Sequence, residues 1–150
     1  MDGLDNGNNS RRVAVVFNPV KGEPEEMKRL VIDAAERHGW ARPEFYETTV
    51  EDPGFTPAQQ AVEDGFDMIF AAGGDGTVRS VAAALRGTDA TLAVLPVGTG
   101  NLLARNLKLP LDVPEAVETA FGGQDTRIDV CTALLTRLDG ESEELDFVVM

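Results

Sequence analysis

The glycine-rich stretch at residues 71–85, AAGGDGTVRSVAAAL, constrains the fold of this chain more than any other feature. It follows the apolar run 68–72, turns through glycines and continues in a pattern that places Val78, Val81 and Leu85 on one helical face. A strand that turns sharply into a helix leaves unpaired N–H groups at the helix start, and glycine lets a ligand come close to them. Such a turn predicts an anion site, above all for phosphate.

Asp75 is the unexpected residue in this turn. A carboxylate repels phosphate unless a cation lies between them or the carboxylate takes up a proton. Asp75 therefore indicates phosphoryl chemistry with Mg²⁺, and it is the candidate catalytic residue. The alternative is a tight turn between a strand and a helix in which Asp75 is only a local cap.

The composition excludes several classes of protein. The chain has 13 basic and 26 acidic residues, a net charge of −13, which argues against a nucleic-acid binder and against attachment to anionic lipid by charge alone. A single cysteine, Cys131, rules out an intrachain disulfide and predicts a reducing, cytoplasmic location. The single histidine, His38, makes an ordinary zinc site improbable and is best explained as a last-turn helix residue.

Strand and helix patterns alternate along the chain. The apolar, β-rich runs that predict strands lie at residues 12–17, 44–49, 66–72 and 91–96. The helical patterns lie at 24–38, from Thr56 and Pro57 to about 64, from the glycine loop to Gly87, at 102–107 and from Asp112 to about 121. This order predicts an α/β fold, a three-layer, Rossmann-like and phosphofructokinase-like domain with a mostly parallel sheet.

Four polar loops follow the four predicted strands. They are NPVKG at 18–22, ETT at 47–49, GGDGT at 73–77 and GTGN at 98–101. Because ligands of such sheets bind at the carboxyl ends of the strands, the loops are expected to converge on one site. Four basic residues that would suit a polyphosphate lie in or just after three of these loops: Lys21, Arg79, Arg105 and Lys108.

The common phosphate-binding and hydrolase motifs are absent. No glycine is followed by lysine, so there is no Walker A loop. Arg79 and Leu103 occupy the places where the dinucleotide fingerprint needs a third glycine. No serine lies in a G-x-S-x-G elbow, which excludes an α/β-hydrolase of the usual kind.

Three motifs in order resemble the diacylglycerol kinase catalytic-domain family, which includes diacylglycerol, sphingosine and ceramide kinases and bacterial lipid kinases. They are Asn18-Pro19-x-x-Gly22, the GGDGT loop, and Pro96-x-Gly98-Thr99-Gly100-Asn101-x-x-Ala104-Arg105, and the resemblance covers roughly residues 12 to 136. GGDGT alone is also compatible with an NAD kinase-like enzyme. The third motif favours the lipid kinases.

The resemblance implies an ATP- and Mg²⁺-dependent kinase that transfers a phosphoryl group to a lipid hydroxyl. It implies nucleotide contacts at Asn18, Gly22, Thr48, Thr49, Gly74, Asp75, Gly76, Thr77, Val78, Arg79, Ser80, Gly98, Thr99 and Asn101, with Arg105 shaping the last loop. No metal-ligand set is assigned. Singly, each residue has an ordinary explanation, such as Asn18 in a turn or Asn101 as a helix N-cap.

The chain departs from the family pattern at three places. Many members have Asp where this chain has Leu102, Asn where it has Arg79, and a small residue where it has Lys21. The loss of the carboxylate at Leu102 puts any metal–water network that depends on it in doubt. It also keeps open the alternative of a nucleotide-binding module that is not an enzyme.

The domain expectations are a flexible tail at 1–11, a nucleotide-binding domain at 12–126 and a β-hairpin at 127–150 that begins a second, β-rich domain. The resemblance implies that the remainder of this second domain supplies the lipid site and peripheral membrane contact. The apolar residues of the hairpin are expected to lack their natural partner: Ile128, Val130, Leu134, Phe147 and Val149. We therefore expect the hairpin to be disordered or to pair in a homodimer.

Overall fold

The computed structural model describes residues 10–123, 130–136 and 142–148. Most of the expected tail, the expected domain boundary at 126 and the tip of the hairpin lie outside these residues. Arg11, at the end of the expected tail, is ordered against the domain, because its guanidinium lies 4.3 Å from the centre of the Trp40 ring and its carbonyl accepts the Ala41 N–H.

The sheet confirms the predicted α/β fold. Its four strands are β1 (Val13–Phe17), β2 (Glu44–Glu47), β3 (Met68–Gly73) and β4 (Thr91–Pro96). They pair in the order β2-β1-β3-β4, and every pairing is parallel. The central strands β1 and β3 are buried along their whole length, whereas β2 at the edge is partly exposed, as its less apolar sequence predicts.

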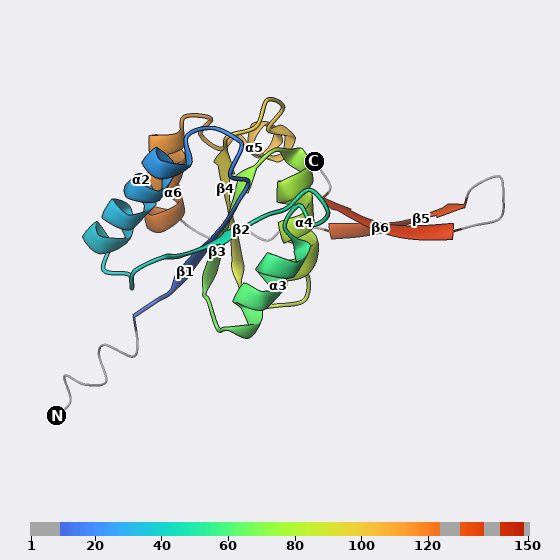
Figure 1. Cartoon of the computed structure of the whole chain (residues 1–150), viewed down its shortest axis with the longest axis horizontal. Helices are drawn as coiled ribbons and strands as arrows, with labels where there is room; N and C mark the ends of the chain where they lie inside the picture. The colour runs from blue at the N-terminus through green and yellow to red at the C-terminus, as the bar shows by residue number, and fades with distance from the viewer. Residues whose placement is uncertain (1–9, 124–129, 137–141, 149–150) are drawn as a thin grey trace.

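Helices cover both faces of the sheet (Figure 1). They are α2 (Pro24–Arg37), α3 (Phe55–Glu63), α4 (Asp75–Leu85), α5 (Leu102–Asn106) and α6 (Val113–Gly122). Helices α2 and α6 pack on one face, and α3, α4 and α5 contribute to the core on the other. Successive residues of β1 alternate between the two cores, which is why its sequence is continuously apolar.

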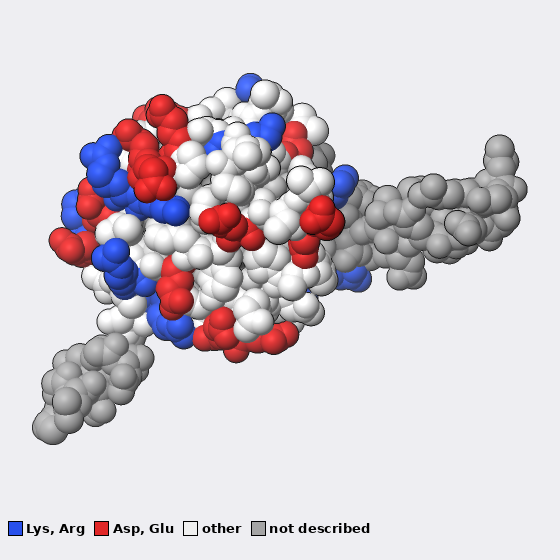
Figure 2. Space-filling view, viewed as in Figure 1, with Lys and Arg blue, Asp and Glu red and all other residues white. Residues whose placement is uncertain are grey.

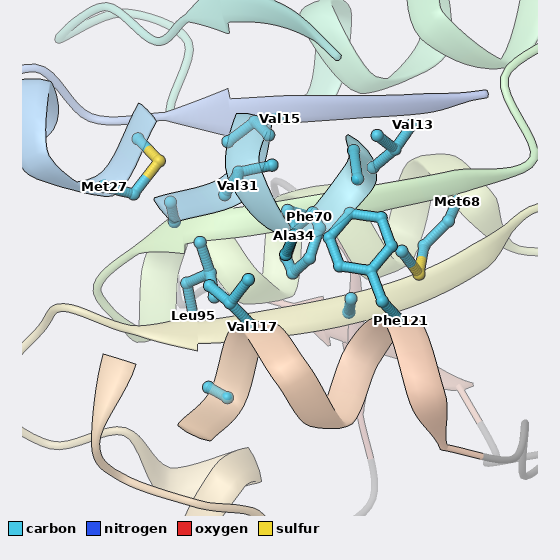
Figure 3. Close-up of a cluster of buried hydrophobic side chains, with 14 of the residues drawn as sticks. Val13, Val15, Met27, Val31, Ala34, Met68, Phe70, Leu95, Val117 and Phe121 are labelled. Atoms are coloured by element: carbon cyan, nitrogen blue, oxygen red, sulfur yellow. The ribbon is translucent and has the colours of Figure 1, made fainter. Parts of the chain in front are cut away.

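The core under α2 and α6 is built around aromatic rings (Figure 3). Phe121 of α6 lies 5.7 Å from Phe70 of β3 and 5.2 Å, edge to face, from Trp40, measured between ring centres. At the rim, Arg37 at the end of α2 and the following His38 both pair with Glu118 of α6. The hydrogen bond from Arg37, and then that from His38, lower the pKa of Glu118 to about 2.

Most helix ends match the sequence signals. Gly39 and Gly87 take positive φ just after α2 and α4, and the carboxylate of Asp112 accepts the Glu115 N–H at the start of α6. His38 is the C-cap of α2, as expected of a last-turn residue.

The predicted capping box at Thr56 is wrong. Helix α3 begins two residues earlier, after Gly54, which takes φ 147° and has no side chain to cap the helix. The capping carboxylate is instead that of Asp52, which accepts the N–H groups of Gly54 and Thr56. Partial burial opposes ionisation of Asp52, but these hydrogen bonds outweigh it and lower the pKa of its carboxyl group.

The predicted β-hairpin is present as β5 (Val130–Thr136) and β6 (Ser142–Val148), an antiparallel pair separate from the main sheet. Strand β6 runs beside α4, and the pair extends away from the α/β body (Figure 1). Ile128 and Val149 lie outside the described residues. The larger β-rich domain and the homodimer stay predictions.

Deleting residues 127–150 should leave the α/β domain folded, because every core residue described lies between Val13 and Phe121. We expect a cooperative thermal transition shifted by less than about 5 °C, measured by circular dichroism beside the complete chain. Sedimentation velocity should also show weaker self-association. A truncated chain without a cooperative transition would show that β5 and β6 belong to the domain's own structure.

Candidate functional site

The four polar loops converge on the carboxyl edge of the sheet, as predicted. The register is parallel throughout, so each loop leaves its strand at that edge. Two backbone hydrogen bonds fix the first loops: the Asn18 N–H donates to Ala72 O at 3.0 Å, and the Thr48 N–H donates to Phe17 O at 2.9 Å. The chain leaves β1 toward one side and β3 toward the other, so the topological switch point lies between their ends.

The two glycine loops touch backbone to backbone. A Cβ added at Gly98 would lie 2.6 Å from the Cα of Gly74 and 3.3 Å from the carbonyl oxygen of Gly73. Glycine is therefore required at position 98 by close approach rather than by φ. The loop after β1 also reaches this region, because a Cβ at Gly22, whose φ is +61°, would lie 3.3 Å from the Cβ of Val97.

Asp75 joins the glycine loops through its side chain. It is the first residue of α4, and its Oδ1 accepts the backbone N–H of Leu102, the first residue of α5, at 2.7 Å. Its Oδ2 faces Gly100, where an added Cβ would lie 2.5 Å away. Asp75 is thus a cap, but for the helix of the other loop, and we call this contact the Asp75 latch.

The GTGN loop is also closed from within. The Asn101 side chain donates to Gly98 O at 3.0 Å and accepts the Gly98 N–H at 3.2 Å, while Arg105 Nε donates to Gly100 O at 2.7 Å. Asn101 takes φ 52°, a conformation that asparagine tolerates better than most residues. It stands at the N-cap position of α5 but makes no capping hydrogen bond; the Asp75 latch takes that role.

The start of α4 is open where a ligand would approach. A Cβ at Gly74 or Gly76 would meet nothing within 4 Å. The first N–H groups of a helix have no partner inside it, so those of α4 are available for hydrogen bonds with an anion. Arg79 is exposed and Ser80 partly exposed on the next turn.

Some of the predicted contact residues are already engaged in the fold. Val78 is buried in the second core and its N–H donates to Gly74 O, so the structure does not bring it to the site. Thr77 is buried, with its side chain against Gly73. The hydroxyl of Thr49 accepts the Asp52 N–H, which closes a local turn.

The remaining predicted residues lie at the carboxyl edge. Asn18 Oδ1 accepts the Val20 N–H at 3.0 Å, and this turn shapes the loop after β1. Thr48 is buried beside the end of β1, whereas Thr99 is exposed in the GTGN loop. Sequence reasoning missed the Asp75 latch, because no local signal links residues that are 27 positions apart.

The described residues contain no group of three or more His, Cys, Asp or Glu side chains that could hold a metal ion. They also contain no helix long and apolar enough to cross a bilayer. Mg²⁺ at nucleotide sites commonly binds one or two carboxylates besides phosphate oxygens and water, so a single carboxylate such as Asp75 fits a metal that arrives with a nucleotide.

Comparison with known proteins decides the family. The diacylglycerol kinase catalytic domain family matches residues 12–133. The chain belongs to this family. Over 125 residues, 80% of the chain, it is 32% identical to a diacylglycerol kinase of Staphylococcus epidermidis and 35% identical to one of Bacillus subtilis. The chain spans only 39% and 41% of these two relatives.

Solved structures show the same fold. A putative diacylglycerol kinase from Bacillus anthracis superposes with a TM-score of 0.70 at 23% identity, covering 81% of this chain and 43% of that one. A second diacylglycerol kinase structure from the same organism gives 0.69 at 24% identity, with 81% and 42% covered. Membership of the family confirms the resemblance, while the role of each site residue remains a prediction.

Gly98→Ala should force the glycine loops apart, because its Cβ would collide with backbone that cannot rotate away. We expect a loss of stability of about 1–3 kcal/mol, the range for overpacking, measured by urea unfolding. Gly76→Ala is the matched control, since its Cβ meets open space in a helix, where alanine is favoured by about 1 kcal/mol. Equal stability of the Gly98→Ala and Gly76→Ala variants would contradict the contact.

Proposed function

We propose that this chain is the nucleotide-binding part of an ATP-dependent, diacylglycerol kinase-like lipid kinase, which transfers the γ-phosphoryl group of ATP to a lipid hydroxyl. The observation that carries the proposal is the Asp75 latch, which joins the two glycine loops beside the topological switch point. Family membership supports the reaction class. The two curated relatives, themselves named diacylglycerol kinases, point to the same substrate class.

The site is suited to catalysis by positioning. The open start of α4 offers N–H groups and a helix dipole to phosphate, and the bare backbone at Gly74 and Gly76 lets phosphate come near. The latch fixes the GTGN loop against this helix before a ligand arrives. Phosphoryl transfer depends mainly on such fixed geometry and on charge stabilisation.

Charge stabilisation would come from the bases near the loops and from a metal. Lys21 and Arg79 are exposed in the loop after β1 and on α4, and both are available to a polyphosphate. Mg²⁺ bound with ATP would neutralise phosphate charge, and Asp75 is the residue that would face it. Both Mg²⁺ and a cytoplasmic location belong to the proposal.

A non-catalytic nucleotide-binding module is the second candidate. It is favoured by one observation: the Asp75 carboxylate is already engaged by the N–H of Leu102, the position where many family members carry a further carboxylate. Binding of ATP without turnover by the full-length protein would identify such a module. An NAD kinase-like enzyme would be identified by a substrate panel that compares NAD with diacylglycerol.

The isolated chain should bind ATP weakly with Mg²⁺ and show almost no kinase activity, because it spans about two fifths of its relatives. Gly76→Ala should weaken ATP binding while it stabilises the fold, since its methyl group would stand at the open start of α4. Isothermal titration and thermal unfolding measure the two effects. Unchanged ATP affinity in Gly76→Ala, or turnover of order 1–10³ s⁻¹ by the isolated chain, would contradict this prediction.

Asp75→Asn removes the negative charge of residue 75 but keeps the Asp75 latch, because the amide oxygen can still accept the Leu102 N–H. In the full-length kinase we expect kcat to fall by about 10²-fold or more, with little change in melting temperature. Asp75→Ala should lower both kcat and the melting temperature. If activity survives in Asp75→Asn and falls only in Asp75→Ala, the residue is a cap without a part in the chemistry.

A further inference from the structure

Residues 102–111, LLARNLKLPL, carry exposed leucines that the site leaves unexplained; we call this stretch the α5 segment. Leu102, Leu107 and Leu111 are 50%, 40% and 42% exposed. Leu103 and Ala104 point into the core and are 2% and 1% exposed. Leu103 and Ala104 therefore anchor the segment, whereas the outer leucines are only partly covered. A single exposed leucine is ordinary, but several within ten residues indicate an interaction surface.

The charges of the α5 segment favour an anionic partner. Arg105 and Lys108 are exposed between the outer leucines. No acidic residue lies between Asp89 and Asp112, although the chain holds 26 of them. The carboxylate of Asp112 is itself engaged by the Glu115 N–H. Figure 2 shows a mostly uncharged surface with scattered basic side chains over α5, whereas acidic and basic side chains are intermixed over α2.

The α5 segment begins where the GTGN loop ends, so it lies at the carboxyl edge of the sheet with the candidate site. A partner held by this segment is therefore held next to the place where phosphate would bind. For a kinase that acts on a lipid, the useful partner at this position is the surface in which the lipid is embedded.

We propose that the α5 segment docks on an anionic lipid surface, with Leu102, Leu107 and Leu111 among the headgroups and Arg105 and Lys108 near the lipid phosphates. The biological reason for this contact rests on the proposed function, whereas the physical argument for lipid binding does not depend on it. Basic residues interleaved with leucine are the composition of segments that lie in a membrane interface. The net charge of −13 does not prevent this contact, since charges more than about 8 Å away are largely screened at physiological salt. The adjoining carboxylates of Asp75 and Asp112 each already accept a backbone N–H.

The test is co-sedimentation of the complete 150-residue chain with vesicles, without ATP. We expect binding to phosphatidylglycerol vesicles that is weaker with phosphatidylcholine and weaker at high salt. Leu107→Ser combined with Leu111→Ser should reduce binding by about ten-fold or more. The matched control is Phe55→Ser on α3, which removes a side chain as exposed as Leu111, 42%, beside Asp52 rather than beside bases.

A second variant tests the charge. Lys108 has a φ of +58°, so Lys108→Asn removes the cation while keeping a residue that accepts this backbone. Binding to phosphatidylglycerol should fall about five-fold, the usual effect of one base near an anionic surface. Arg42→Gln, which removes an exposed base two residues before β2, should leave binding unchanged.

Three results would overturn the proposal. The first is no binding of the chain to anionic vesicles, and the second is that the Leu107→Ser, Leu111→Ser variant binds them as well as the unaltered chain. The third is that this variant loses self-association while its vesicle binding is unchanged. The last would assign the α5 segment to a protein partner. ATP titration in solution separates this proposal from the proposed function. A chain that binds ATP but no vesicles contradicts only the docking surface, and a chain that binds vesicles but no ATP contradicts only the nucleotide site.

Discussion

The hydrogen bond from the Leu102 N–H to Asp75 is the contact on which the carboxyl edge of the sheet depends. It joins the first residues of two helices that follow neighbouring strands. The close approach of Gly98 to Gly74 is possible only because Gly98 has no side chain, and the Asp75 carboxylate joins the same two loops through the Leu102 N–H. The shape of each glycine loop therefore depends on its contacts with the other loop.

The parts of the fold that could be predicted are those with local signals. A strand buried on both faces is continuously apolar, and β1 is buried at every position. A helix that ends in a left-handed residue favours glycine, and Gly39 takes a φ of +78° there. Because parallel strands bring their carboxyl ends to one edge, the convergence of the four loops followed from strand order alone.

The sequence could not predict contacts between residues that are far apart in the chain. Nor could it predict which of several equally suitable residues nearby would cap a helix. The sequence around Asp75 predicts a cap, but not that the capped helix begins 27 residues later. Thr56 and Asp52 are both good capping residues, and the structure uses Asp52; a Cβ added at the intervening Gly54 would lie 3.2 Å from Val81 and 3.4 Å from Val16. Asn101 looks like an N-cap, yet its amide closes its own loop.

The shortness of α5 has a consequence for the order in which the chain folds. Its helical span is five residues, far below the roughly 12–15 that an isolated helix needs in water. Helix α5 therefore has no stable existence until β3, β4 and the start of α4 have assembled and brought Asp75 to its first N–H. We therefore expect the GTGN loop to become ordered only after the long-range pairing of the sheet, because that pairing brings Asp75 to α5.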